Sequence, residues 1–305
     1  MQERIYLGRN RIAARQSWGG WIVAPGFNLD VAVGAIRDAA IEPWTTRLVQ
    51  EMLKPGDVYL NAGGNFGYYA ALGGSIVGPS GKVVVVEPNP HIFPFLMETT
   101  MWSGVVAWTR VVKRALDQSA GRTLNFAFDP QYLGGGAAVR GGLSGIVRAS
   151  IDDAIWSHAN IDEMLDEKGV WVAGTGQYIE FSVKTTTIDD LCNDLPPLKL
   201  IHLDIEGSEP FALKGAMHTI ERSPQMRLIT EWSGAHYAHG SEEARACFDT
   251  FAEFSTRLGF RARQLIPRIG DQGSISVSPV LTLEHMRSAA EHGDYVWIKA
   301  EHDYW

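Results

Sequence analysis

The sequence predicts a doubly wound, Rossmann-like α/β fold. Short β-branched or apolar runs alternate with stretches of helical length and pattern along most of its 305 residues. The clearest strand is 82–87, where four consecutive valines lie in the segment between Gly81 and Pro88. Such a run is typical of a strand buried on both faces. Its alternation with helices indicates a parallel sheet that is covered by helices on both sides.

Apolar spacing and turn residues define the other elements. Trp44, Leu48 and Val49 recur at helical spacing after Pro43, a residue that suits a first helical turn. We expect helices over 43–53, 66–77, 90–101, 208–222 and 241–258. We expect strands over 57–60, 82–87, 110–116, 123–128, 179–185, 198–204, 226–231, 260–266 and 295–299.

The alternation is interrupted at two places. Residues 1–40 are mixed in character, with turn signals only, and we interpret them as an N-terminal extension to a domain spanning 41–305. Glycines at 134–136 and 141–142 lie in a less regular stretch, which we interpret as an insertion at about 129–178. A loop of this length is often a functional lid or edge.

Composition excludes several classes of partner and location. The net charge is −8 and the Lys and Arg residues are scattered, which argues against nucleic acid or an anionic membrane as the partner. Cys192 and Cys247 form no metal-binding spacing, which indicates a reducing compartment. No apolar run approaches the ~18 residues of a membrane span. We therefore expect a cytoplasmic protein.

A glycine-rich turn follows the first strand of the expected domain. Asn61 and Ala62 lead into Gly63-Gly64-Asn65-Phe66-Gly67, and a helix follows. Glycines allow the backbone to approach a ligand, and the helix N-terminus offers free N–H groups. The alternative is a tight strand-to-helix connection with no ligand.

Glu87 ends the valine strand roughly 20 residues after that turn, a spacing typical of nucleotide-binding α/β folds. An acid there can accept both hydroxyl hydrogens of a ribose. The alternative is a helix N-cap. Together, turn and acid predict a nucleoside-containing ligand, either NAD or S-adenosylmethionine. The dinucleotide fingerprint lacks its first glycine here, since Ala62 stands at that position.

Three carboxylates follow a later strand: Asp204, Glu206 and Glu209. They fall at the carboxyl edge of the sheet, where ligands bind in such folds. A dehydrogenase has no obvious need for them, whereas a methyltransferase can use them to hold a cation or a sugar hydroxyl, or to take up a proton. This segment favours S-adenosylmethionine over NAD. Glu209 is expected in the first turn of the following helix, where an acid favours the dipole.

The chain resembles the FkbM family of methyltransferases over about residues 42–300. The pattern of aspartate, glutamate-glycine and glutamate at Asp204, Glu206-Gly207 and Glu209 is the family's most distinctive mark. The other matching segments are 54–57, 63–69, 86–90, 189–191, 213–216 and Glu231. The resemblance implies a seven-stranded methyltransferase sheet whose last strand is antiparallel. It also implies methylation of hydroxyls of sugars, polyketides and related metabolites.

The resemblance and the glycine turn together give the expected cofactor site. We expect S-adenosylmethionine to contact Asn61, Gly63, Gly64, Asn65, Gly67, Glu87 and Asp204. The family usually has aspartate at position 61 and alanine at 64. Asn61 keeps a hydrogen-bond acceptor but lacks the charge that favours the positive methionine end of the cofactor. The departure implies weaker binding, another acid in its place, or a non-catalytic relative.

Methyl transfer to a hydroxyl needs orientation and a proton acceptor or metal. The catalytic candidates are Asp204, Glu206, Glu231 and His236, and a divalent ion can be held by Asp204, Glu231 and His236. Trp232 lines the acceptor pocket or packs in the core, and His202 is a core histidine. We predict an O-methyltransferase acting on a hydroxyl of a glycan or secondary metabolite, with an NAD-dependent oxidoreductase or a non-catalytic nucleoside-binding protein as alternatives.

Overall fold

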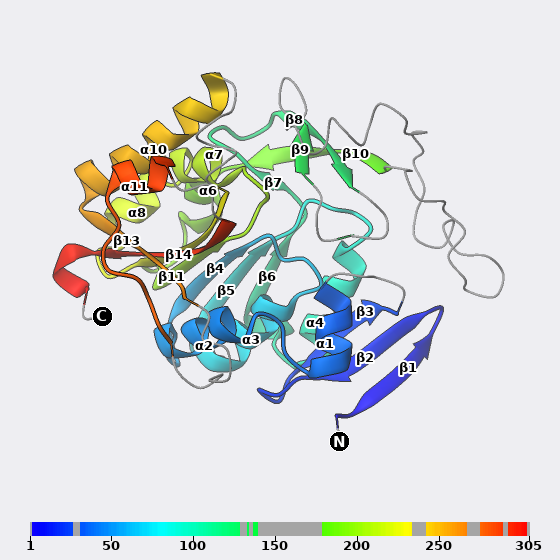
Figure 1. Ribbon diagram of the computed structural model, residues 1–305. Coiled ribbons are helices and arrows are strands. Elements are labelled where there is room, and N and C mark those ends of the chain that lie inside the picture. Colours follow the sequence, from blue (N-terminus) through cyan, green and yellow to red (C-terminus); the bar gives the residue numbers. More distant parts are fainter. Residues whose placement is uncertain are drawn as a thin grey trace.

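The computed structural model describes residues 2–26, 31–128, 133, 137–139, 179–233, 242–266, 275–288 and 292–303 (Figure 1). Its centre is a seven-stranded sheet in the order β13-β14-β12-β11-β4-β5-β6. The strands are β4 (Val58–Ala62), β5 (Lys82–Val86), β6 (Thr109–Val112), β11 (Leu200–Leu203), β12 (Arg227–Ser233), β13 (Phe260–Gln264) and β14 (His292–Lys299).

The direction of the strands confirms the predicted fold class. Strands β12, β11, β4, β5 and β6 pair in parallel, in that order. The last strand, β14, lies between β12 and β13 and is antiparallel to both. The sheet is therefore the doubly wound, seven-stranded arrangement with an antiparallel last strand that the sequence predicts.

Helices cover both faces of this sheet (Figure 1). On one side lie α2 (Pro43–Met52), α3 (Tyr68–Val77) and α4 (Phe93–Trp102). On the other lie α6 (Ile188–Cys192), α7 (Glu209–Lys214), α8 (Met217–Glu221), α10 (Glu242–Leu258) and α11 (Leu283–Ser288). Alternate residues of β4 enter the two cores: Tyr59 joins the cluster of the first side and Leu60 that of the second. None of the described helices is long and apolar enough to cross a membrane.

Two predicted elements are divided in the structure. The single helix predicted over 208–222 is wrong, because α7 and α8 are separate. The Gly215 carbonyl accepts the Asp189 N–H at 2.9 Å, and the Asp189 carboxylate accepts the N–H groups of His218 (3.2 Å) and Thr219 (2.7 Å), which caps α8. The strand predicted over 110–116 is also divided, into β6 and β7 (Ala115–Leu116).

Strand β7 belongs to a second sheet above the carboxyl edge of the first. This four-stranded sheet has the order β7-β10-β8-β9 and includes β8 (Thr123–Phe128), β9 (Ala137–Val139) and β10 (Ile179–Thr186). Strand β10 is parallel to β7 and antiparallel to β8. The insertion predicted at 129–178 falls outside the described residues apart from Leu133 and β9.

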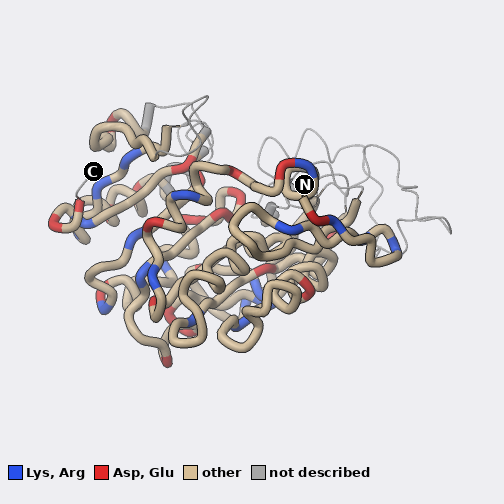
Figure 2. The backbone as a smooth tube through the Cα atoms, turned by 90° about the horizontal axis from the view of Figure 1, so that it is seen from below, with Lys and Arg blue, Asp and Glu red and all other residues tan. Residues whose placement is uncertain are grey.

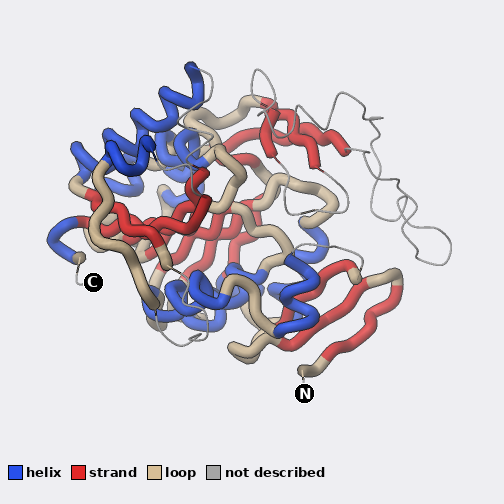
Figure 3. The backbone as a smooth tube through the Cα atoms, viewed as in Figure 1, coloured by secondary structure: helices blue, strands red, loops and turns tan. Residues whose placement is uncertain are grey.

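The N-terminal residues form strands that the sequence analysis missed. β1 (Arg4–Gly8), β2 (Arg11–Arg15) and β3 (Trp21–Pro25) form an antiparallel three-stranded sheet beside the central one, followed by α1 (Val31–Asp38) (Figure 3). Hydroxyls of Thr99 in α4 and of its C-cap Ser103 bind β3: Val23 N–H donates to Thr99 Oγ1 and Trp21 N–H to Ser103 Oγ, both at 2.9 Å. The division into an extension and a domain remains a prediction.

Charged residues of both signs are interspersed along the described chain, as the view in Figure 2 shows. This distribution agrees with the scattered Lys and Arg residues of the sequence.

The fold generates a stability prediction at Gly63. Its φ is +83°, and a Cβ at this position would lie 1.7 Å from the Asp204 carbonyl oxygen. We expect Gly63→Ala to lower the free energy of unfolding by roughly 3–5 kcal/mol, from left-handed strain and overpacking together. The measurement is urea unfolding followed by circular dichroism.

Gly104→Ala is the matched control, because Gly104 has φ +72° and nothing within 4 Å of an added Cβ. We expect it to cost only the strain, about 1–2 kcal/mol. Equal losses in the two variants would contradict the close approach of Gly63 to Asp204.

Candidate functional site

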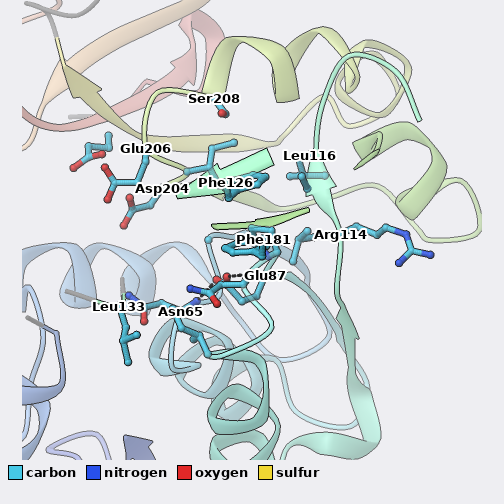
Figure 4. Close-up of a pocket in the computed structure, with 18 of the residues that line it drawn as sticks. Asn65, Glu87, Arg114, Leu116, Phe126, Leu133, Phe181, Asp204, Glu206 and Ser208 are labelled. Carbon is cyan, nitrogen blue, oxygen red and sulfur yellow. Dashed lines mark hydrogen bonds between the residues drawn. The ribbon is translucent and has the colours of Figure 1, made fainter. Parts of the chain in front are cut away.

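A cavity of about 290 Å³ lies at the carboxyl edge of the central sheet (Figure 4). Its size is near the lower end of the range for small-molecule sites, roughly 300–1,000 Å³. Residues after β4, β5 and β11 and in β12 line one part, and residues of the second sheet line another. This is where ligands bind in doubly wound sheets.

The glycine turn forms one edge of the cavity. Gly63 and Gly64 both donate their N–H groups to the Val86 carbonyl, at 3.0 and 2.9 Å, so that the turn is fixed to the end of β5. Gly63 and Asn65 line the cavity. Asn65 has a left-handed backbone, φ 44°, and its N–H donates to Glu87 Oε2 at 2.8 Å.

Gly64 and Gly67 are not among the lining residues. A Cβ on Gly64 would lie 2.5 Å from Val85 Cγ2, and one on Gly67 would lie 2.9 Å from Leu96 Cδ1. Both glycines therefore allow the turn to pack closely against β5 and α4. Their predicted contact with the cofactor remains a prediction.

Glu87 lies where the sequence predicts, directly after β5 and in the cavity wall. Its carboxylate accepts the N–H groups of Asn65 and, at 2.7 Å, Asn89. Helix α4 begins only at Phe93, with Ile92 as N-cap, so Glu87 does not cap the helix. Burial raises the pKa of Glu87 to about 7, and the two N–H donors oppose that rise.

Asn61 is buried within β4, at 1% exposure, and is not among the lining residues. Neither its side-chain oxygen nor its nitrogen has a hydrogen-bond partner in the part of the chain that the structure describes. In the sheet, Asn61 is paired with His202 of β11 and Val85 of β5. A role for Asn61 in cofactor binding remains a prediction.

Three carboxylates meet at one end of the cavity. Asp204 and Glu206 follow β11, and Glu231 lies in the neighbouring strand β12; carboxylate oxygens of the three lie within 4.8 Å of one another. The predicted proximity of Asp204 and Glu231 is confirmed. Oxygen ligands in this number suit a hard divalent cation such as Mg²⁺ or Mn²⁺. His236, the third predicted metal ligand and a catalytic candidate, lies outside the described residues.

The loop that carries Asp204 and Glu206 is fixed from within. Glu206 has φ 52° and Gly207 has φ 84°, so the chain turns sharply after β11. Glu209, in the first turn of α7 as predicted, is 1% exposed, and its Oε1 accepts the Ile205 N–H at 2.9 Å. Glu209 therefore holds the loop in place.

The carboxylates raise one another's pKa values. Burial, and then the charges of Glu231, Glu42 and Glu206, hold the pKa of Asp204 well above its usual range. Burial, and then the charges of Glu206, Glu209 and Asp294, raise the pKa of Glu231 to about 8. Carboxyls with raised pKa values hold protons more tightly than ordinary ones, and perturbed carboxyls in a cavity are typical of functional sites.

The sequence analysis missed Glu42, which lines the same end of the cavity. It is the N-cap of α2 and has a left-handed backbone, φ 41°, a strained conformation costing of order 1–3 kcal/mol for a residue other than glycine. The Tyr69 hydroxyl donates to its Oε2 at 2.7 Å. Burial and then the charge of Asp294 raise its pKa, while the Tyr69 hydrogen bond lowers it. No sequence signal marks Glu42, since only tertiary packing brings it here.

The second sheet supplies an apolar wall that was also missed. Phe126 of β8 and Phe181 of β10 are stacked at 5.2 Å with an interplanar angle of 9°. Ile92, Leu116 and Leu133 extend this wall. Glu87 lies beside Phe181 and Asn65 in Figure 4, with Asp204 and Glu206 to one side. The predicted strands 123–128 and 179–185 carried the signal, because alternate apolar residues mark one face of a strand.

Two aromatic residues near the site belong to the core. Trp232 is fully buried and packs against Phe251 at 5.1 Å, so it does not line an acceptor pocket. His202 is a core histidine, as predicted: it packs on Tyr69 at 4.6 Å, and burial lowers its pKa to about 4.

Comparison with solved structures gives remote similarities. A putative O-methyltransferase from Klebsiella pneumoniae has 11% sequence identity and a TM-score of 0.40, over 84% of this chain and 77% of that one. An O-methyltransferase from Bacillus cereus, in complex with SAH, has 11% identity and a TM-score of 0.43, over 90% and 84%. A putative rRNA methylase from Clostridium thermocellum has 9% identity and a TM-score of 0.41, over 84% and 93%.

No curated protein sequence matches the chain. The family model described as the methyltransferase FkbM domain matches residues 61–262, which is more than half of the chain and includes the glycine turn, Glu87, Asp204 and Glu231. These are the residues that the structure gathers at the carboxyl edge of the sheet. The chain therefore belongs to the FkbM family and is a methyltransferase that uses S-adenosylmethionine.

Proposed function

We propose that this enzyme transfers the methyl group of S-adenosylmethionine to a hydroxyl of a glycan or of a glycosylated or other secondary metabolite. The observation that carries the proposal is the group of carboxylates with raised pKa values, Asp204 and Glu231 above all, at one end of a cavity with an apolar wall. A hydroxyl must lose its proton as it is methylated, and a carboxylate of this kind can accept it.

The cavity offers separate surfaces for the parts of the donor. Glu87, with Gly63 and Asn65 beside it, is the proposed partner of the ribose hydroxyls. The stacked Phe126 and Phe181 are the proposed partners of the adenine ring, since both lie close to Glu87 (Figure 4). When bound, S-adenosylmethionine supplies a methyl group on a positively charged sulfur.

The carboxylates provide the proton acceptor. In an in-line displacement, the hydroxyl oxygen forms a bond to the methyl carbon while the carbon–sulfur bond breaks and its electron pair remains on sulfur. Asp204 is the proposed group that takes the hydroxyl proton, with Glu231 next to it on the neighbouring strand. Glu206 and His236 remain candidates for the same task. The two carboxylates lie close together and repel each other, which favours uptake of one proton by the pair.

A divalent cation is an alternative way to activate the hydroxyl. Asp204, Glu206 and Glu231 provide the hard oxygen ligands that such an ion needs, and His236 is a further proposed ligand. A cation here would act as a Lewis acid on the acceptor oxygen.

We place the enzyme in the cytoplasm and its acceptor among small molecules and glycans rather than nucleic acids. The net charge of −8 and the scattered basic residues support an acceptor that is not a nucleic acid. Cys192 supports the cytoplasmic location, because it is a buried free thiol whose pKa burial raises to about 12.

Of the three predictions for the proposed function, the first concerns the donor. Isothermal titration calorimetry should detect binding of S-adenosylmethionine and S-adenosylhomocysteine and no binding of NAD. Glu87→Ala should weaken binding of both sulfur ligands by ~1.5–3 kcal/mol, the range for a hydrogen bond to a charged group. Glu51→Ala, at an exposed α2 position paired with Arg47, should leave binding unchanged. Unchanged affinity in Glu87→Ala would contradict the ribose assignment.

The second prediction separates a base from a metal. Asp204→Asn should lower turnover about 100- to 10,000-fold, the usual cost of losing a positioned base, while donor affinity stays nearly unchanged. Turnover is measured by transfer of labelled methyl to a panel of glycans and secondary metabolites. If EDTA silences the wild type and Mg²⁺ or Mn²⁺ restores it, Asp204 is a metal ligand, and Glu206→Gln should then raise the metal concentration required. Normal turnover of Asp204→Asn, with and without EDTA, would contradict this placement.

The third prediction concerns pH. Asp204 and the neighbouring Glu231 must together lose a proton before Asp204 can act as the base, so kcat/KM should rise between pH 6 and 9 as Glu231, whose pKa is about 8, ionises. Stability should change in the opposite sense: the folded pKa of Glu231 is above its usual value, so its contribution is present at low pH and lost as pH rises through about 8.

Glu231→Gln should flatten the fall in stability with pH, measured as the free energy of unfolding in urea at pH 5, 7 and 9. A wild-type pH–rate profile that is flat over this range would exclude Glu231 and its neighbours as the base.

A further inference from the structure

We propose that Glu42 binds the ammonium group of the donor's methionine moiety. Glu42 precedes the matched family segment, which begins at residue 61. The inference rests on the donor placement against Glu87 proposed above.

The position of Glu42 allows direct contact with a ligand. Its side chain keeps accessible surface and lines the cavity together with Asp204 and Glu231. The Tyr69 hydroxyl binds Oε2 at 2.7 Å, which orients the carboxylate, and no other hydrogen bond to it occurs within the described ranges. Glu42 is thus an oriented acceptor that faces the cavity.

The charge around Glu42 favours a cation. Asp204, Glu231 and Asp294 all lie close enough to interact with it electrostatically. Arg114 is the only Lys or Arg among the described lining residues, and its side chain extends away from Asp204 and Glu206 (Figure 4). Its Nη1 donates to the Lys113 carbonyl instead. An incoming ammonium group would therefore meet negative potential at this end.

The direction of the donor selects the ammonium over the sulfonium. In S-adenosylmethionine the sulfur is attached to the ribose, and the amino group lies at the far end of the methionine chain. With the ribose at Glu87, the sulfur falls next to the glycine turn, where Gly63 contacts the Asp204 backbone. The amino group then extends toward the wall that α2 contributes, where Glu42 is located.

The test compares three ligands by calorimetry: S-adenosylmethionine, S-adenosylhomocysteine and 5′-methylthioadenosine. The first two carry the ammonium group, only the first carries a sulfonium, and the third carries neither. We expect Glu42→Gln to weaken binding of the first two by about 10- to 100-fold, the loss of one charged hydrogen bond, and to change the third less than about twofold. Retained binding of 5′-methylthioadenosine also shows that the variant is folded.

Two further variants make the result specific. Tyr69→Phe keeps the charge but removes the hydroxyl that orients it, so the same ligand pattern should appear with a smaller loss. Glu51→Gln, an exposed glutamate of α2, is the control and should bind all three ligands normally.

Several outcomes would overturn the proposal. Equal weakening of all three ligands, or of none, would remove Glu42 from the ammonium site. Weakening of S-adenosylmethionine alone would assign the contact to the sulfonium instead. A wrong placement of the donor would give a different result: Glu87→Ala would then bind 5′-methylthioadenosine with unchanged affinity.

Discussion

The close contact between Gly63 and the Asp204 backbone is the constraint on which the site depends. Asp204 N–H donates to the Ala62 carbonyl at 3.1 Å, and Gly63 N–H donates to the Val86 carbonyl at 3.0 Å. The ends of β11, β4 and β5 are thereby held at one level. Only a residue without a side chain fits between them, because a Cβ would overlap the Asp204 carbonyl oxygen. Glu87 and Asp204 consequently lie on opposite sides of one narrow turn.

This closeness brings several acids together, and the burial that raises the pKa values of Glu87, Asp204 and Glu231 is unfavourable for their ionised forms. The structure offsets the cost with backbone and hydroxyl donors. Glu87 accepts two backbone N–H groups, and the Tyr69 hydroxyl donates to Glu42. Asp204 and Glu231 retain strongly raised pKa values. A protein that only needed to fold would gain from neutral residues here, so the arrangement is explained by a ligand or a proton that the acids accept.

The N-terminal residues are integral to this site although they precede the matched family segment. Trp18 packs on Tyr68 at 5.7 Å, Tyr68 on Tyr69 at 5.2 Å, and Tyr69 on His202 of the central sheet. This line of rings connects the N-terminal sheet to β11. Thr46 of α2 donates its hydroxyl to the Tyr68 hydroxyl at 3.1 Å, so the placement of α2, and with it Glu42, depends on packing between segments that are far apart in the sequence.

Local patterns in the sequence determined the parallel strands, because the valine run 82–87 and the glycine turn each require a particular backbone environment. They also determined that Glu87, Asp204 and Glu231 lie at one edge of the sheet, since the parallel alternation brings all carboxyl ends to that edge. The sequence could not show that Gly215 and Asp189 divide a helix, or that Trp232 turns into the core. Only the tertiary structure brought Glu42 and the Phe126–Phe181 pair to the cavity, because contacts between distant segments set their positions. The alternation in 123–128 and 179–185 marks an apolar face of each strand but does not encode what that face lines.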